Sequence, residues 1–418
     1  MDAASVLTRD RQIAGRKPSG SLSASVFGAG PTGALLALGL ARMGCNVQLQ
    51  DPLSLNDLAA RSRAYAVTHS SRRLLQRLGL WDDLLPHLIP FHQLRLQDEF
   101  VRPLVWFRAK DLAPANRGAG AIGWILDHKP LMQLLLARLQ QQPTVHLSLG
   151  HSSSTGIPAS AESSELWIAA DGPRSLHRQD WRLPWWSLPY RQGCLTAKVL
   201  LRGIDPGTAY EFFRSEGPFA VLPLGGQAYQ VVWSAPLKRC QERAMLESSV
   251  FLDRLASVLP TGLIPDALLD QPVAVPLQLS LAPRLGRRQQ LLVGESGHRC
   301  HPVGGQGLNL CWRDVSALLD LVERHRSNPT SLRRLVRRYS RGRLPDLILV
   351  ALSTDLLLRV FSNRLPVLLP VRAFALALLR RWPLLRRLAL QAMSDGPMTF
   401  LQVPPEWKQG GHCDGVEF

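Results

Sequence analysis

A glycine-rich stretch, GESGHRCHPVGGQGLNL at residues 294–310, concentrates groups that could do chemistry. His298, Cys300 and His301 carry donor atoms that zinc prefers, while the glycines after them could cradle a phosphate at a helix N-terminus. No matching ligand pair stands at metal spacing elsewhere in the chain, so we expect no metal site. A phosphate cradle and a simple turn stay open at this point.

Two elements must position this stretch. RRQQLLVGES predicts a buried strand that runs into the loop. After the loop, apolar residues recur at helical spacing, at Leu308, Val315, Leu318, Leu319 and Val322. The N-terminus of such a helix carries the equivalent of about half a positive charge, which suits an anionic ligand.

A second glycine loop lies near the amino end, where SVF, GAGPTG, ALLALGLARMG and NVQLQD predict strand, turn, helix and strand. Gly28 would allow the tight turn, Gly30 the approach of a pyrophosphate, and Gly33 close packing of the helix on the strand. Asp51 ends the second strand, where a carboxylate can accept hydrogen bonds from a ribose. This order predicts a dinucleotide-binding domain.

Composition limits the class of protein. The chain has 418 residues, 46% of them hydrophobic, with 32 Gly and 31 Pro, which indicates two or three loop-rich globular domains. Its 6 Cys include no CxxC pair, which argues against a zinc ribbon or disulfide framework and for a reducing compartment. No apolar run is long enough to span a membrane, and the amino end lacks the apolar core of a signal peptide. We therefore expect a cytoplasmic protein.

Positive charge is concentrated near the carboxyl end. The net charge is +17, and residues 324–387 alone contain 15 Arg, no Lys and two acids, Asp346 and Asp355. The same residues are rich in leucine. Helices that bury leucine and solvate arginine, or an amphipathic surface for anionic lipid headgroups, are both open interpretations. Nucleic-acid binding is not expected, because no groove-reading or base-stacking motif accompanies the charge.

The middle of the chain differs from its two ends. Between Gly193 and about Pro283, alternating segments predict an antiparallel sheet, interrupted by one helix at residues 243–259. We expect an α/β fold in which a Rossmann-type nucleotide domain is interleaved with a mostly antiparallel β-sheet substrate domain, followed by C-terminal helices. The expected parts are a disordered arm (1–24), the nucleotide domain (25–95, 120–180 and 285–330), the substrate domain (96–119 and 181–284), a basic helical region (331–397) and a tail (398–418).

A third motif, LWIAADGPRS, predicts a strand that ends at Asp171. The GAGPTG loop, this motif and residues 294–310 follow one another along the chain. Together they resemble the FAD-dependent aromatic monooxygenases, and most closely the hydroxylases of ubiquinone biosynthesis. RAYAVTHSSRRLLQRLGLWDDL, YEFFRSEGPFAVLPL, GQGLNLCWRDV and RYSRGRLPDLILVALSTDLLLRVFSN are also similar to that subgroup. The resemblance implies that FAD is the cofactor and that residues 294–310 form a flavin cradle.

The resemblance also assigns roles to single residues. Asp51 would hold the adenosine ribose of FAD, Arg63 would reach the pyrophosphate and ribityl chain, and Asp171 would contact the flavin and reductant regions. The start of the helix that follows the 294–310 loop would face the flavin pyrimidine edge and stabilise the anionic reduced flavin. The residues concerned there are Gly305, Gln306, Gly307, Leu308 and Asn309.

Two positions in the loop need separate comment. Where the family has aspartate, this chain has Glu295, and the extra methylene moves the carboxylate by about 1.5 Å. Either the loop recedes to compensate, or a contact with a ribitol hydroxyl is lost. Pro302 lies beside the flavin in the family pattern and is the catalytic candidate, through backbone geometry rather than as an acid or base.

The activity implied by the resemblance is that of a monooxygenase. NAD(P)H would reduce the flavin, and one oxygen atom of O2 would pass to an electron-rich ring, with the chemistry supplied largely by the cofactor. The implied substrate is a prenylated phenol or quinone precursor at a membrane surface. Two alternatives are an FAD-dependent reductase of prenyl double bonds and a flavin-poor, non-catalytic subunit of a quinone-biosynthesis complex. The sequence does not predict the oligomeric state.

Overall fold

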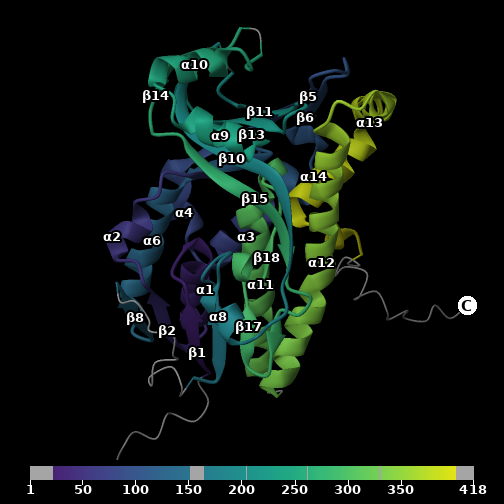
Figure 1. The fold of residues 1–418 in the computed structure, drawn as a ribbon. Coiled ribbons are helices and arrows are strands. Elements are labelled where there is room, and N and C mark those ends of the chain that lie inside the picture. Colours follow the sequence, from purple (N-terminus) through teal and green to yellow (C-terminus); the bar gives the residue numbers. More distant parts are fainter. Residues whose placement is uncertain (1–21, 151–163, 204, 261, 329–330, 402–418) are drawn as a thin grey trace, which may run out of the picture.

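The computed structural model describes residues 22–150, 164–203, 205–260, 262–328 and 331–401. Nearly all of the expected amino-terminal arm and most of the expected tail lie outside these residues. Figure 1 shows an α/β body below, a sheet body above it, and the long helix α12 (Leu332–Phe361) along one side of both. The fold is the predicted mixture of an α/β domain, a mostly antiparallel sheet and C-terminal helices.

The lower body is built on a six-stranded sheet with the strand order β16-β17-β9-β1-β2-β8. Its strands are β1 (Ser23–Phe27), β2 (Asn46–Asp51), β8 (Val145–Leu149), β9 (Leu166–Ala169), β16 (Gly286–Arg287) and β17 (Gln290–Leu292). Helix α1 (Pro31–Arg42) connects β1 to β2, which run parallel as the sequence predicted. Its buried face is made of small and leucine side chains, so it lies directly on the sheet.

Three distant segments meet at one edge of this sheet. β1 pairs in parallel with β9, and β17 pairs in parallel with β9. Parallel strands end at the same edge, so the loops that follow Phe27, Ala169 and Leu292 lie side by side. The pairing thus brings together all three glycine-containing motifs, which the sequence separates by more than a hundred residues each.

The upper body is a nine-stranded sheet in the order β18-β15-β10-β13-β12-β11-β5-β6, with β14 beside β10. Its strands are β5 (Gln93–Asp98), β6 (Val105–Arg108), β10 (Trp186–Arg202), β11 (Thr208–Phe213), β12 (Phe219–Gly225), β13 (Ala228–Pro236), β14 (Ile264–Leu268), β15 (Val273–Leu281) and β18 (His298–Arg299). All described pairings are antiparallel except that of β11 with β5. Because β18 belongs to the 294–310 loop, that loop joins the two bodies.

The single helix predicted at residues 243–259 is wrong. The structure has two helices, α9 (Leu237–Ala244) and α10 (Ser248–Ala256), separated by an extended Glu247. Helix α9 packs on β10 and β15, whereas α10 packs on β14. One straight helix could not contact both places, so tertiary packing overrides the local helical pattern.

A small sheet, β3-β7-β4, and several helices complete the lower body. These are β3 (Ala64–Val67), β4 (Leu88–Phe91), β7 (Gly123–Asp127), α2 (Leu55–Ala59), α3 (His69–Arg77), α4 (Trp81–Leu84), α5 (Pro114–Arg117), α6 (His128–Gln140), α8 (Leu176–Asp180) and α11 (Gln306–Ser327). Helix α11 packs against α1, α3 and α12, which places its N-terminus beside β3.

The carboxyl end is helical, with α13 (Leu369–Arg381) and α14 (Pro383–Asp395) after α12. Phe361, Leu376 and Leu390 of these helices share a buried cluster with Phe107 of β6 and Phe213 of β11. The helices therefore close one side of the upper sheet. Among the described residues, none of the helices has the length and apolarity that crossing a membrane requires.

Candidate functional site

The first glycine loop has the geometry that a bound dinucleotide needs. Gly28 has φ +102°, and a Cβ there would lie 2.5 Å from the Ala170 carbonyl oxygen. A Cβ at Gly33 would lie 1.8 Å from the Gly28 carbonyl oxygen, so only glycine lets α1 approach β1 this closely. A Cβ at Gly30 would meet nothing within 4 Å. The chain thus leaves open space in front of the first turn of α1.

Asp51 shapes this loop as well as facing it. Its Oδ2 accepts a hydrogen bond of 2.7 Å from the Ala29 N–H, and its Oδ1 accepts one of 2.9 Å from the Leu53 N–H. Each carboxylate oxygen has a second lone pair available for a ligand. The ribose contact expected of Asp51 stays a prediction, and the structure adds that this residue fixes the loop that would bind the pyrophosphate.

Asp171 lies at the same sheet edge, against Gly28. Its Oδ2 is 2.9 Å from Nδ1 of His177, whose ring stacks on Phe27 with centroids 3.9 Å apart. Burial alone would raise the pKa of Asp171, but hydrogen bonds from His177 and Ser175 outweigh it and lower the pKa. Its Oδ1 is buried and has no partner among the described residues. A buried acceptor without a partner is costly, and a ligand donor would satisfy it.

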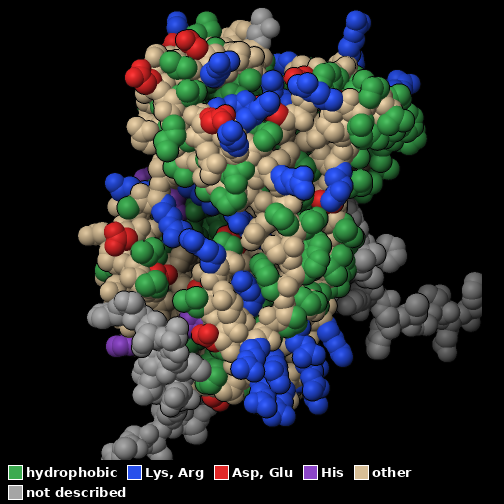
Figure 2. All heavy atoms as spheres, viewed as in Figure 1, with side chains coloured by type: hydrophobic (Ala, Val, Ile, Leu, Met, Phe, Trp, Pro, Cys, Tyr) green, Lys and Arg blue, Asp and Glu red, His purple; other side chains and the backbone are tan. Residues whose placement is uncertain are grey.

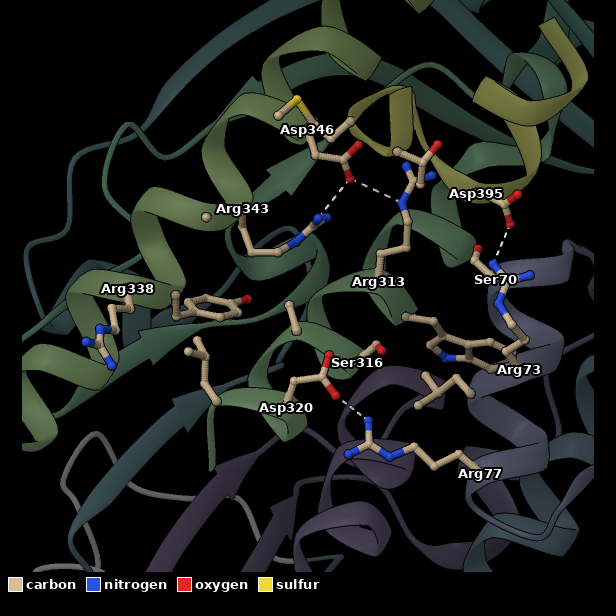
Figure 3. Close-up of a pocket in the computed structure, with 18 of the residues that line it drawn as sticks. Ser70, Arg73, Arg77, Arg313, Ser316, Asp320, Arg338, Arg343, Asp346 and Asp395 are labelled. Atoms are coloured by element: carbon tan, nitrogen blue, oxygen red, sulfur yellow. Dashed lines mark hydrogen bonds and ion pairs between the residues drawn. The ribbon is translucent and has the colours of Figure 1, made fainter. Parts of the chain in front are cut away.

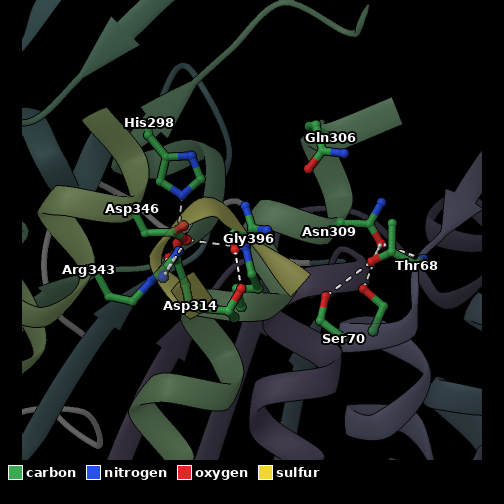
Figure 4. Close-up of polar contacts among 12 residues, drawn as sticks. Thr68, Ser70, His298, Gln306, Asn309, Asp314, Arg343, Asp346 and Gly396 are labelled. Atoms are coloured by element: carbon green, nitrogen blue, oxygen red, sulfur yellow. Dashed lines mark hydrogen bonds and ion pairs between the residues drawn. The ribbon is translucent and has the colours of Figure 1, made fainter. Parts of the chain in front are cut away.

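The 294–301 loop is held by a buried carboxylate, Asp314 of α11 (Figure 4). Asp314 Oδ2 accepts a hydrogen bond of 2.9 Å from the Gly294 N–H and lies 2.6 Å from Nε2 of His298. Its Oδ1 accepts a hydrogen bond of 2.7 Å from Nε of Arg343. Burial alone would raise the pKa of Asp314, but the charges of His298 and Arg343 hold it at about 2. The carboxylate is therefore ionised throughout the physiological range.

Glu295 projects from this anchored loop with no hydrogen bond among the described residues, and it keeps part of its surface exposed. Burial and, second to it, the negative charge of Glu295 raise the pKa of Cys300 to about 12. The same two causes raise the pKa of Cys311. The carboxylate is therefore free to accept a hydrogen bond from a ligand. Whether it reaches a ribitol hydroxyl stays a prediction.

The turn into α11 depends on two left-handed glycines. Gly304 and Gly305 have φ of 68° and 64°. A Cβ at Gly305 would lie 2.8 Å from the Ala66 Cβ, while one at Gly307 would meet nothing within 4 Å. The Pro302 carbonyl accepts a 2.9 Å hydrogen bond from the Gly305 N–H, so proline shapes the turn through its backbone. The first turn of α11 therefore faces open space.

Two side chains predicted to contact the cofactor are used by the protein itself. Asn309 accepts hydrogen bonds from the Thr68 N–H at 3.0 Å and the Ser71 hydroxyl at 2.7 Å. Its amide donates to the Ala66 and Gly305 carbonyls. The Gln306 amide likewise donates to Met393 at 2.9 Å. These side chains position the helix N-terminus, although Oε1 of Gln306 is buried and has no partner among the described residues. Contact of residues 305–309, including Leu308, with the cofactor stays a prediction.

Arg63 lies just before β3, and its side chain is exposed. Its guanidinium is 5.4 Å from the centre of the Tyr65 ring, and its charge reaches Cys194 of β10. Figure 2 shows the surface hollowed between the two bodies, with Lys and Arg side chains at the rim. Arg63 is exposed and could close over a bound anionic group.

The donor atoms that first suggested a metal do not converge. His298 is paired with Asp314, and Nδ1 of His301 lies 3.3 Å from the Val303 N–H. Within the part of the chain that the structure describes, no group of three or more His, Cys, Asp or Glu side chains could hold a metal ion. Burial lowers the pKa of His301 to about 4, so its ring is neutral.

A separate cavity of about 490 Å³ lies between α3, α11 and α12 (Figure 3). Its arginines are largely paired with acids that also line it: Arg73 with Asp395, Arg77 with Asp320, and Arg343 with Asp346. The cavity lies beside the middle of α11, away from the helix N-terminus. The ion pairs that line the cavity hold the helices together, and we therefore do not take this cavity as the active site.

The geometry as a whole fits FAD. A Cβ at Gly30 or at Gly307 would meet open space, and a buried oxygen of Asp171 has no partner among the described residues. Gly30 and Asp171 follow β1 and β9, which end at the same sheet edge as the strand before the 294–310 loop. These features match the phosphates, the ribityl chain and the flavin ring that the glycine loops and helix N-termini would accommodate.

Comparison with known proteins agrees with this fit. The model of a family described as "FAD binding domain" matches residues 156–345, which include Asp171 and the whole 294–310 loop. The chain is 30% identical over 413 residues to the ubiquinone hydroxylase UbiL of Rhodospirillum rubrum, covering 92% of each protein. The chain belongs to the FAD-dependent hydroxylases of ubiquinone biosynthesis. It is a flavin-dependent monooxygenase.

Other similarities extend over most of the chain. The 3-demethoxyubiquinol 3-hydroxylase of Escherichia coli is 28% identical over 394 residues, covering 88% of this chain and 97% of that protein. The structure of PqsL from Pseudomonas aeruginosa in complex with 2-aminobenzoylacetate has a TM-score of 0.70 at 18% identity, over 85% of this chain and 99% of that one. The latter shows the same fold. NAD(P)H is the reductant typical of this family.

Sequence reasoning missed three residues that build this site: Asp314, His177 and Arg343. Asp314 and Arg343 bind partners that are distant in sequence, and His177, which contacts Asp171, lies in a segment without a recognisable motif. The RD pair within GQGLNLCWRDV was a usable signal for Asp314, because an acid on the buried face of a helix requires a partner.

We predict that Gly30→Val removes FAD without unfolding the protein. A Cβ at this position meets no protein atom within 4 Å, and Gly30 has φ −64°, which valine can adopt, so we expect the branched side chain to obstruct a pyrophosphate rather than the protein. The purified variant should lack the flavin absorbance of the wild type while its thermal unfolding changes little. Gly118→Val is the matched control, since a Cβ there also meets open space. Full FAD content in Gly30→Val would show that the pyrophosphate does not lie in this loop.

We predict that Glu295→Asp tightens FAD binding. The loop backbone is fixed by Asp314, so it cannot shift to suit a longer side chain, and the shorter one needs less ordering to reach a hydroxyl. One improved hydrogen bond contributes about 1 kcal/mol, or roughly fivefold in Kd. Titration of FAD into both apoproteins measures the difference, with Glu295→Gln as the uncharged control of equal length. Equal affinity of all three forms would mean that this side chain does not touch FAD.

Proposed function

We propose that this monooxygenase hydroxylates the aromatic ring of a polyprenyl phenol or quinone precursor, using NAD(P)H and O2. The observation that carries the proposal is a buried apolar cluster shared by residues 294–310 (the flavin loop), the upper sheet and the C-terminal helices. One buried cluster contains Val303 of the loop, Phe213 of the upper sheet, and Phe361 and Leu376 of α12 and α13. We infer that the ring and isoprenoid tail of the substrate lie against this apolar cluster.

The chemistry that bound FAD would supply is oxidation of NAD(P)H and transfer of one oxygen atom of O2 to the ring, with the other oxygen atom leaving as water. The chain itself would bind and orient the cofactor and the substrate, and would exclude water from the site. The backbone of residues 305–309 and the positive end of α11 would favour a negative charge on the flavin pyrimidine edge. The apolar cluster would keep water from the reacting ring.

The C-terminal helices also present an apolar outer face. Figure 2 shows hydrophobic side chains gathered over α12 and α13 on one side of the molecule, with Lys and Arg clustered at the amino end of α12. Several large apolar residues there are each more than half exposed: Leu352, Leu356, Leu365, Val367, Val371, Phe374, Trp382 and Leu384. Exposed apolar patches bordered by basic residues are typical of surfaces that contact membranes.

The arginines of this region divide into two groups. Arg372 lies fully buried 3.6 Å from Asp98, Arg343 is paired with Asp314, and Arg386 is 3.2 Å from Asp111. Arg380 and Arg381 are exposed beside Trp382. The first interpretation of the basic region describes these paired arginines, which fasten the helices to the protein. The exposed Arg380 and Arg381 support the proposed contact with lipid headgroups. The exposed apolar side chains of this face would insert among the lipid tails, which charged side chains alone do not do.

We predict oxygen-dependent hydroxylation of a phenol that carries a short isoprenoid chain. Holoenzyme, NAD(P)H and ¹⁸O2 should give a product with one labelled oxygen on the ring, measured by mass spectrometry. Gly30→Val, which should lack FAD, is the negative control. Reduction of a tail double bond without oxygen would instead favour a prenyl reductase, and the absence of any product would contradict the proposal.

We predict reversible binding to anionic liposomes through the outer face of α12–α14. Arg380→Gln with Arg381→Gln should weaken co-sedimentation by roughly 30-fold, at about 1 kcal/mol for each basic residue, and mainly at low salt. Phe374→Ser with Trp382→Ser should weaken it at every salt concentration, because apolar insertion is not screened. Arg239→Gln with Arg254→Gln, exposed on α9 and α10, is the matched control. Unchanged binding of both α13 variants would reject this face.

A further inference from the structure

Glu211 lies on β11 and has no place in the FAD cradle described above. Side chains alternate along this strand: Tyr210 and Phe212 join the buried cluster on one face of the sheet, whereas Ala209 and Phe213 join the cluster that contains Val303 of the flavin loop. By this alternation Glu211 shares its face with Ala209 and Phe213. Its carboxyl is thus turned toward the flavin loop.

The surroundings of Glu211 are apolar. Its cross-strand neighbours are Ala220 on β12 and Leu96 on β5. The polar group that reaches its carboxyl is the backbone N–H of Gly304, in the turn before α11. Burial raises the pKa of Glu211 to about 8, and the hydrogen bond from Gly304 offsets only part of that rise. The side chain nevertheless keeps some accessible surface, as expected at the wall of a cavity.

Glu211 also lies on the cradle side of the upper sheet. Cys194 lies on β10, which β13 and β12 separate from β11, and the pKa of its thiol responds to the negative charge of Glu211 and to the positive charge of Arg63. Arg63 lies just before β3, which contacts the turn at residues 303–305 that contains Gly304. The carboxyl therefore lies between this turn and the buried cluster of Ala209, Phe213 and Val303, which is the side of the sheet where the ring of the proposed substrate would lie.

We propose that Glu211 is the acid–base residue of this monooxygenase and exchanges a proton with the ring hydroxyl of the substrate. The inference rests on the proposed function, since it needs a phenolic substrate. The O–H bond of the phenol breaks, its electron pair stays on the ring oxygen, and a new O–H bond forms on the carboxylate. The phenolate ring is richer in electrons and accepts oxygen more readily. The carboxyl returns its proton to the product's oxygen, so the enzyme ends unchanged.

Other titratable groups near the loop suit this role less well. His301 is fully buried, and its pKa near 4 leaves it neutral. Burial and Asp355 raise the pKa of Tyr190 far above neutrality. Asp98, which lies on the same sheet face, is paired with the buried Arg372, and Cys194 has a pKa of about 12. A general base is most effective when its pKa lies near the working pH, and Glu211 meets that condition.

The test compares holoenzymes of wild type, Glu211→Gln, Glu211→Asp and the control Glu242→Gln, an exposed carboxylate on α9. The substrate is the phenol with a short isoprenoid chain. Wild-type hydroxylation should rise with pH through one ionisation near 8, because the ionised carboxylate is the base. Glu211→Gln should lose that rise and fall 10²- to 10⁴-fold, the usual effect of an acid–base group. Bound FAD should stay within twofold of wild type, and Glu211→Asp should recover part of the rate.

A second readout needs no substrate. The folded protein holds the Glu211 proton between pH 4.5 and about 8 while the unfolded chain has lost it, so stability falls as pH rises through that window. Glu211→Gln should remove this fall, raising its urea midpoint relative to wild type at pH 8.5 more than at pH 5.

The outcomes are distinct. A Glu211→Gln enzyme that keeps the pH rise and more than a tenth of the rate would overturn the inference and leave the proposed function standing. A wild type that forms no hydroxylated phenol would overturn the proposed function, and the inference with it. Equal stability differences at both pH values would show that the carboxyl is not buried as proposed.

Discussion

The arrangement of the site depends on one buried carboxylate, Asp314. It is fully buried and touches three segments at once: the backbone of Gly294, the ring of His298 and the guanidinium of Arg343. A buried charge is tolerated only when it is paired and hydrogen-bonded, and removal of one partner typically costs 3–5 kcal/mol, an order-of-magnitude figure. The position of the flavin loop and the position of the long helix α12 are therefore set by the same interaction.

The parallel sheet provides the frame on which that interaction acts. Strand order places the ends of β1, β9 and β17 next to one another, and each end carries one part of the cradle. The loop after β17 must then cross to the upper sheet, where β18 pairs with β15. Asp314 holds the loop midway in this crossing. The loop that is predicted to bind FAD is therefore also the segment that joins the two bodies.

The sequence predicted the parts of the site that depend on local geometry. The glycines at 28, 30 and 33 and the acids at strand ends follow from the β–α–β order, and the structure places them at one edge. The roles of Gln306 and Asn309 were harder to predict, because their hydrogen bonds go to residues 87 and 243 positions away, Met393 and Ala66. Nor does composition distinguish Arg372, which is fully buried, from Arg380, which is exposed.

Glu211 was not predictable for the same reason. Within AYEFF it looks like any polar residue of an alternating strand, and alternation normally turns such a residue to solvent. The strand is instead covered on both faces, by α9 and α10 with their cluster on one side and by the flavin loop and C-terminal helices on the other. The apolar surroundings that would admit an isoprenoid tail are also what desolvate the carboxyl and raise its pKa toward neutrality. A more polar interior would bind the tail less well and return Glu211 to a weak base, so substrate class and proton chemistry are coupled through a single property of the fold.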